Sequence, residues 1–146
     1  MESGLLHLHN LLRWIILILL LVAIYQAFSR KEGIRKSSLW LLIAAHTTLL
    51  IGLYQWFSGN FGLKLIKTLG MGEVMKNSAT RFWAIEHIFG MLLGIVLITL
   101  ARNKAKKLSY QSASWLYVFA LLVILASVPW PFREAIARPW FPGMKL

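Results

Sequence analysis

Four long apolar stretches follow one another along the chain, and short polar segments separate them. They cover residues of about 5–28, 38–57, 80–101 and 112–130. Because an apolar helix of roughly 20 residues crosses the hydrocarbon core of a bilayer, each stretch is predicted to be a transmembrane helix. The predicted fold class is therefore all-α, an integral membrane four-helix bundle. Residues 1–146 are expected to form a single transmembrane domain.

The longest connection, 58–79, contains one more helical pattern. In the stretch FGLKLIKTLG, apolar residues are interleaved with Lys64 and Lys67. This pattern is typical of an amphipathic helix that lies in the membrane interface. Gly70 and Gly72 are expected to end that helix.

Composition agrees with a membrane protein. The chain is 58% hydrophobic and only 14% charged, whereas about a quarter of the residues in a soluble domain are charged. The net charge is +11, but the cations gather in short loops beside apolar spans. Anionic lipid headgroups and topology therefore explain this charge better than nucleic acid, which is not expected as a partner.

Two residue types are missing, and their absence narrows the chemistry. The chain has no cysteine, which excludes disulfides, thiolate metal sites and covalently attached c-type haem. It also has no aspartate, so most of the side chains that paired-carboxylate or Ser-His-Asp catalysis needs are missing. A stand-alone enzyme is therefore a weaker expectation than an electron carrier or a subunit of a larger complex.

The two short loops predict the orientation of the chain in the membrane. SRKEGIRKSS and ARNKAKKLSY each carry four cations close to the ends of the spans. Loops rich in Lys and Arg stay on the cytoplasmic side. Both termini and the 58–79 connection are then expected on the outer side.

The third apolar stretch carries the most informative polar residues. Arg81, Glu86 and His87 lie near its start, and Ser78 or Asn77 is placed to cap the helix. At 100° per residue His87 shares one face with two glycines, Gly90 and Gly94. One interpretation is a small-residue helix-packing motif beside a hydrogen-bonded histidine. The other is a haem ligand, with the glycines leaving room for the ring.

Two other histidines can join His87. His46 lies near the middle of the second span, and His9 precedes Arg13 by one turn in the first. A b-type haem held by two imidazoles needs ligands on facing helices, and His46 with His87 is the first choice. Their depths differ, at roughly 16 Å and roughly 9 Å from one surface at 1.5 Å per residue. His9 is therefore the alternative partner of His87.

Charged side chains complete this hypothesis. Arg13 or Arg81 is placed to neutralise a haem propionate, because a guanidinium matches a carboxylate. Glu86 can pair with an arginine or hold the second ring nitrogen of a ligand histidine. The predicted cofactor-binding set is His46, His87, His9, Arg13, Arg81 and Glu86, with His46 and His87 as metal ligands.

Several motifs also resemble a known family. LHNLLRW, AAHTTLLIGLY, RFWAIEHIFGMLLGIVLITLAR and VPWPFR are similar, in matching order, to small bacterial four-helix integral membrane proteins described as cytochrome b-like. The resemblance implies a bundle with histidines on the first three helices, at His9, His46 and His87. It also implies a multi-pass protein of the bacterial inner (cytoplasmic) membrane.

Three functions are compatible with these features. The leading hypothesis is a b-type cytochrome-like protein that relays electrons, with a membrane redox complex or quinone as partner. The alternative is a haem-free accessory or structural subunit of a larger membrane complex, where Gly90 and Gly94 support packing with another helix or an oligomer. The third is a membrane enzyme or transporter that uses Glu86 and His87 as a proton relay, or a metal site of three histidines and Glu86.

Overall fold

The computed structural model describes residues 2–144, and the side chains of residues 4–144. Every regular element in this range is helical. Four segments are long and apolar enough to cross a membrane: Gly4–Phe28, Ile34–Leu69, Ser78–Lys106 and Tyr110–Ser127. The helices are α1 (Glu2–Phe28), α2 (Ile34–Ser58), α3 (Leu63–Leu69), α4 (Met71–Lys76), α5 (Ser78–Arg81), the π-helix η1 (Phe82–Glu86), α6 (His87–Lys106) and α7 (Tyr110–Ser127). The prediction of an all-α membrane bundle with four spans is therefore confirmed.

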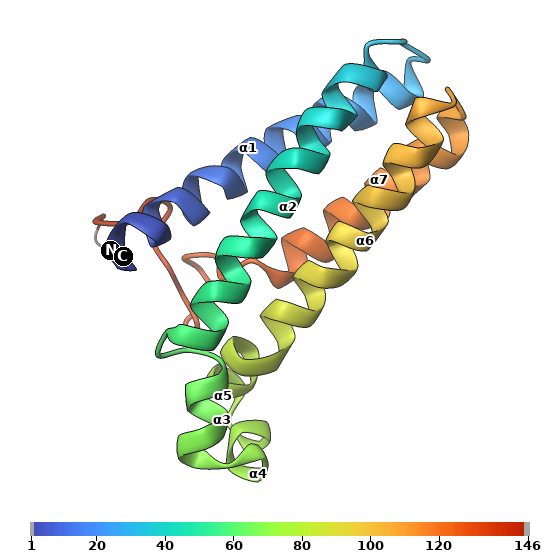
Figure 1. Ribbon diagram of the computed structural model, residues 1–146. Helices are drawn as coiled ribbons and strands as arrows, with labels where there is room; N and C mark the ends of the chain where they lie inside the picture. Colours follow the sequence, from blue (N-terminus) through green and yellow to red (C-terminus); the bar gives the residue numbers. More distant parts are fainter. Residues whose placement is uncertain (1, 145–146) are drawn as a thin grey trace.

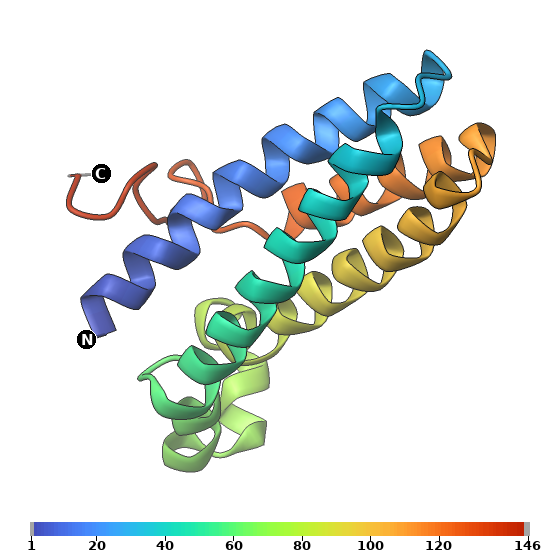
Figure 2. The same cartoon turned by 45° about the horizontal axis from the view of Figure 1, so that its top comes forward.

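The four long helices form two antiparallel hairpins that pack side by side (Figure 1). One hairpin is α1 with α2 and the other is α6 with α7; α2 packs on α6 and α1 on α7. The two short connections, 29–33 and 107–109, lie together at one end, which we call the loop end (Figures 1 and 2). The short helices α3, α4 and α5 lie at the opposite end, which we call the tail end.

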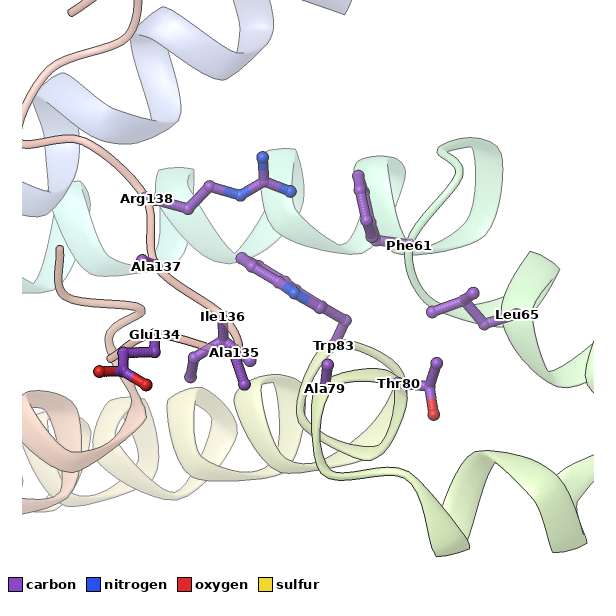
Figure 3. A pocket seen from close by; sticks show the side chains of 10 residues that line it. All are labelled: Phe61, Leu65, Ala79, Thr80, Trp83, Glu134, Ala135, Ile136, Ala137 and Arg138. Atoms are coloured by element: carbon purple, nitrogen blue, oxygen red, sulfur yellow. The ribbon is translucent and has the colours of Figure 1, made fainter. Parts of the chain in front are cut away.

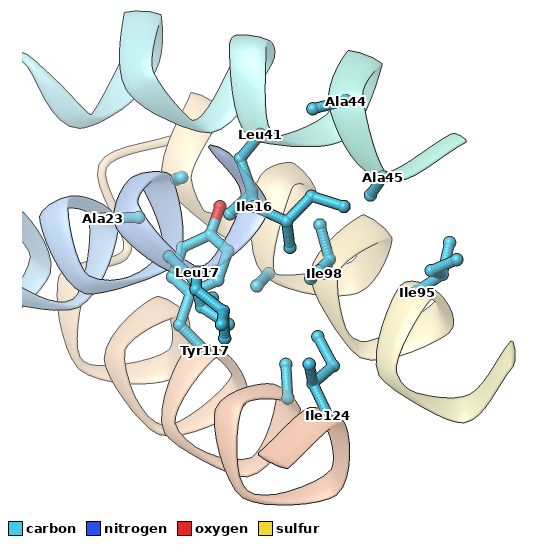
Figure 4. Close-up of a cluster of buried hydrophobic side chains, with 14 of the residues drawn as sticks. Ile16, Leu17, Ala23, Leu41, Ala44, Ala45, Ile95, Ile98, Tyr117 and Ile124 are labelled. Carbon is cyan, nitrogen blue, oxygen red and sulfur yellow. The ribbon is translucent and has the colours of Figure 1, made fainter. Parts of the chain in front are cut away.

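The core between the helices combines a few large side chains with many alanines. Leu20 is fully buried. So are Leu41, Ile98 and Tyr117, which Figure 4 shows. Small residues let membrane helices approach closely, and the buried alanines are Ala23, Ala27, Ala44, Ala45, Ala101, Ala105, Ala113 and Ala120. Large apolar side chains such as Leu50, Phe89 and Phe119 are exposed instead. A helix that is apolar on its outer face as well as its inner one suits a lipid environment.

Several helix boundaries differ from the sequence prediction by a few residues. α2 begins at Ile34 and includes the basic residues Arg35 and Lys36. The third span begins at Ser78 and the last ends at Ser127. Pro129 follows directly, and proline cannot continue a helix because it lacks a backbone N–H.

The connection between α2 and the third span is more helical than expected. α3 corresponds to the predicted interfacial helix and ends at Gly70, whose φ of 80° lies in the left-handed region that glycine tolerates. Gly72 lies inside α4, so the prediction that Gly72 ends a helix is wrong. Asn77 caps α5 by accepting hydrogen bonds from the backbone N–H groups of Ala79 and Thr80. The cap was predicted at Asn77 or Ser78, and Asn77 supplies it.

The π-helix η1 was not predicted. It widens the third span by one residue per turn between Phe82 and Glu86, a feature often found at functional sites. The Trp56 indole N–H of α2 donates a hydrogen bond of 2.9 Å to the Ala84 carbonyl inside this segment. A side chain of α2 therefore supports the widened turn.

The C-terminal segment 128–144, which we call the tail, folds back across the tail end (Figure 2). The Trp140 carbonyl accepts hydrogen bonds from the Arg13 guanidinium at 2.8 Å and from the Trp14 indole at 3.3 Å. Two residues earlier in the tail, the Arg138 guanidinium lies 4.8 Å from the centre of the Trp83 ring. The tail thus connects α1 to η1 across the end of the bundle.

Candidate functional site

His9 of α1 and His87 of α6 face each other near the tail end. Their ring centroids are 6.4 Å apart and their planes are inclined by 60°. α1 and α6 belong to different hairpins and lie diagonally across the bundle, so the two rings meet in its interior. The structure therefore brings together the alternative partner, His9, and His87.

The ring of His87 is held in one orientation. Its Nδ1 lies 2.8 Å from the Ser127 carbonyl at the end of α7. A carbonyl only accepts, so Nδ1 carries the hydrogen and Nε2 keeps its lone pair. No hydrogen bond reaches this Nε2 from any residue that the structure describes. This is the arrangement in which histidine is ready to bind a metal through Nε2.

His9 lies over a glycine of the neighbouring helix. A Cβ added to Gly52 of α2 would lie 3.3 Å from His9 Cε1, so the missing side chain makes room for the imidazole. The Nδ1 atom of His9 is buried and has no hydrogen-bond partner. A buried unpaired ring nitrogen is costly, so this atom is free to accept or donate a further hydrogen bond.

Gly52 was not predicted as a site residue. In the sequence, Gly52 is visible only as a glycine among apolar residues of the second span. The packing of α1 on α2 is needed to show that the His9 ring fills the space beside it.

Arg13 is a half-buried cation one turn beyond His9. Its guanidinium donates to Trp140 O and lies 5.2 Å and 5.9 Å from the centres of the Trp14 and Trp130 rings. Its Nε is buried without a partner. Neither ion pair between described residues includes Arg13. An unpaired guanidinium beside two imidazoles is suited to an anionic group.

Arg81 and Glu86 bind each other instead of the histidines. The two side chains form an ion pair of 2.6 Å across η1, and Arg81 also donates to the Met75 carbonyl. The hypothesis that Glu86 holds a ligand nitrogen is wrong for His87, because Ser127 takes that position. The alternative that Glu86 pairs with an arginine is what the structure shows.

His46 does not pair with His87. Its side chain is exposed on α2, and its Nδ1 lies 3.0 Å from the Leu42 carbonyl of the same helix. The preceding residue, Ala45, is fully buried and faces the core. Since successive residues on a helix point about 100° apart, His46 is turned away from the interior. The first-choice pair, His46 with His87, is therefore not brought together, and the histidine that lies beside His87 is His9.

Gly90 and Gly94 face α7. A Cβ on Gly90 would overlap the Ser127 side chain, and one on Gly94 would lie 2.8 Å from Ile124 Cγ1. These glycines are thus the contact surface for α7 within the chain. They leave no room for a ring on that face, and α7 already covers the surface on which an oligomer was predicted.

Two open pockets of about 350 Å³ lie at the tail end, and tail residues 134–136 line both of them. Figure 3 shows the more apolar one, with Trp83 in its centre and Phe61, Thr80 and Arg138 around it. The Trp83 ring is also 6.1 Å from the ring of His87. The Trp83 side chain therefore contacts this pocket and also lies next to the ring of His87.

Among the described side chains, those of residues 4–144, no cluster of three or more His, Cys, Asp or Glu is arranged to hold a metal ion. The predicted metal site of three histidines and Glu86 is therefore not formed. No family model, curated protein or solved structure matches this chain.

Proposed function

We propose that this four-span membrane protein binds haem between His9 and His87 and relays electrons. One observation carries the proposal, the 6.4 Å separation of the two ring centroids. A metal-bound imidazole nitrogen lies about 2 Å from its metal and the ring centre about 1 Å farther, so two ligands on opposite sides of a metal have centroids roughly 6 Å apart. His9 and His87 would therefore be the residues that hold the iron of a b-type haem.

The surrounding residues support this assignment. The Ser127 carbonyl keeps Nε2 of His87 unprotonated, as ligation requires. Gly52 leaves the space in which the His9 ring lies. The Arg13 guanidinium has no carboxylate partner and is the group placed to bind a propionate. Bound haem supplies one-electron redox chemistry, whose potential depends on burial and nearby charge.

The partners follow from the position of the pair. We place the tail end on the outer side of a bacterial inner membrane, because the loop end carries the two four-cation loops. The pocket beside Trp83 is open and mainly apolar, and a lipid-soluble electron donor such as a quinol is the proposed partner there, with a membrane redox complex as the other candidate. In either case electrons enter close to His87.

The test is a reduced-minus-oxidised spectrum of protein purified from haem-sufficient cells. We expect a b-type difference spectrum in the wild type that His9→Ala or His87→Ala abolishes. His46→Ala is the matched control and keeps the spectrum, because His46 faces away from the pair. A colourless wild-type protein that takes up no added haem would contradict the proposal, as would loss of the spectrum in His46→Ala alone.

A second candidate is a haem-free accessory subunit of a larger membrane complex. The observation that favours it is the internal pairing of the polar groups: Arg81 with Glu86, and Arg13 with the tail. In this candidate, these contacts have a structural role: they fix the register of the helices. In that case the protein co-purifies with a defined complex, and the yield of that complex is the same with His9→Ala as with the wild type.

A further inference from the structure

The most unusual polar side chains outside the proposed haem site lie in the middle of α2. His46 is the thirteenth of the 25 residues of this helix, about 18 Å from either end at 1.5 Å per residue. His46 and the adjacent Thr47 are both exposed. This depth corresponds to the centre of the hydrocarbon core, which is about 30 Å thick. Ionisable side chains there normally face a protein partner.

The hydrogen bonds within α2 leave one polar atom unused. His46 Nδ1 donates to the Leu42 carbonyl at 3.0 Å, so Nε2 is an acceptor on an exposed side chain. The Thr47 hydroxyl donates to the Ile43 carbonyl at 2.8 Å and can turn toward another acceptor. An acceptor without a partner and a movable donor thus lie next to each other on one exposed surface.

The rest of this surface is apolar and exposed. We define the outward face of α2 as Leu39, Ile43, His46, Thr47 and Leu50, all of them exposed. At 100° per residue these five positions fall within one stripe along the helix. Leu41, Ala44 and Ala45 on the opposite side form the core instead. The outward face therefore has the form of a transmembrane helix–helix interface that lacks its second helix.

We propose that this face binds the same face of a second copy in a parallel dimer, with Nε2 of each His46 accepting a hydrogen bond from Thr47 of the other chain. A two-fold axis along the membrane normal places identical residues at identical depth. The acceptor of each copy then meets the donor of the other, and the two hydrogen bonds form reciprocally. No other partner is guaranteed to present a donor at this depth. The dimer uses neither Gly90 nor Gly94 and does not depend on haem.

Cysteine cross-linking tests the interface directly, because the chain has no cysteine of its own. Leu50→Cys places a thiol on the outward face, and Leu93→Cys on α6 is the control. Both leucines are exposed, at 69% and 51%. In native membranes under mild oxidation we expect a disulfide dimer from Leu50→Cys and none from Leu93→Cys. Equal cross-linking of the two variants, no dimer from Leu50→Cys, or cross-linking of Leu50→Cys only to a different protein would overturn the proposal.

Energy transfer between labelled copies in lipid vesicles then tests the polar pair. His46→Leu and Thr47→Val each remove both reciprocal hydrogen bonds, and we expect the dimer to be about 3- to 10-fold weaker. Thr99→Val is the matched control, because the Thr99 hydroxyl also donates to the carbonyl four residues earlier but lies on α6. Circular dichroism verifies that each variant is folded. Unchanged dimerisation in folded His46→Leu and Thr47→Val would refute the assigned contact.

Discussion

His87 and Ser127 are joined in two ways. The His87 ring donates through Nδ1 to the Ser127 carbonyl at 2.8 Å, and the Ser127 side chain fills the space above Gly90. One residue at the end of α7 therefore both orients the imidazole and packs against α6. The position of the proposed haem ligand depends on this contact between two helices that are adjacent in sequence.

Gly90→Ala tests the packing half of this contact. The added methyl group meets the Ser127 side chain, and overpacking of a tight contact costs about 1–3 kcal/mol. We expect a lower thermal unfolding midpoint in detergent. Gly72→Ala is the control, because nothing lies within 4 Å of its added Cβ. The double variant Gly90→Ala/Ser127→Gly should recover part of the loss; a Gly90→Ala protein as stable as Gly72→Ala would contradict this account.

Asn77→Ala should loosen the start of the third span. The Asn77 side chain accepts hydrogen bonds from two backbone N–H groups, at 2.9 and 3.1 Å, and loss of such a cap costs about 1 kcal/mol. Hydrogen exchange should accelerate at Ala79 and Thr80 while α6 stays protected. In the control, Asn60→Ala, the lost side-chain contact is with Lys64 at the surface, so exchange at Ala79 and Thr80 should not change.

Tyr117→Phe should leave stability unchanged or raise it. The Tyr117 side chain is fully buried, and its hydroxyl lies near the Ser38 side chain without forming a hydrogen bond of ordinary geometry. Removing an unpaired buried hydroxyl removes a desolvation cost while the aromatic ring keeps its packing. Ser38→Ala is the contrasting variant: it deletes the acceptor of a 3.1 Å hydrogen bond from Arg102 and should cost about 1 kcal/mol. Chemical unfolding in mixed detergent compares the two; a large loss in Tyr117→Phe would show that the hydroxyl has a partner.

Trp56→Phe should destabilise the π-helix. The substitution keeps an aromatic ring but removes the 2.9 Å hydrogen bond to Ala84 O, a loss of about 1 kcal/mol. We expect faster hydrogen exchange through residues 82–87. Trp115→Phe is the control, because Trp115 is exposed on α7 and contacts only Phe28 and Phe119 among the aromatic rings. Identical exchange in the two variants would mean that Trp56 does not support η1.

Local signals along the chain were sufficient for the four spans and for α3, but not for α4 or η1. Apolar length predicted the four spans, because only a helix satisfies its own backbone in lipid. Gly70 and Asn77 marked helix ends for equally local reasons, a positive φ and a side chain that accepts from the first N–H groups. These properties depend on neighbours within a few residues, so they can be read from the sequence.

The members of the candidate site could be predicted only as a set of alternatives. His9, His46 and His87 are all imidazoles within apolar stretches, and nothing local distinguishes a ring that faces inward from one that faces outward. When a helix is apolar on every side, its hydrophobic pattern does not determine its rotation about its own axis. The packing of Ala45 into the core determines it here and turns His46 outward.

The sequence by itself therefore determined the class of protein: an all-helical membrane bundle with four spans and a few polar residues inside them. Only the tertiary structure decided that His9 meets His87, that Gly90 and Gly94 receive α7, and that Arg13 is held by the tail. The physical reason is distance along the chain. Helix formation in lipid is set by nearby residues, whereas the pairing of side chains from α1, α6, α7 and the tail is set by contacts between segments far apart in sequence.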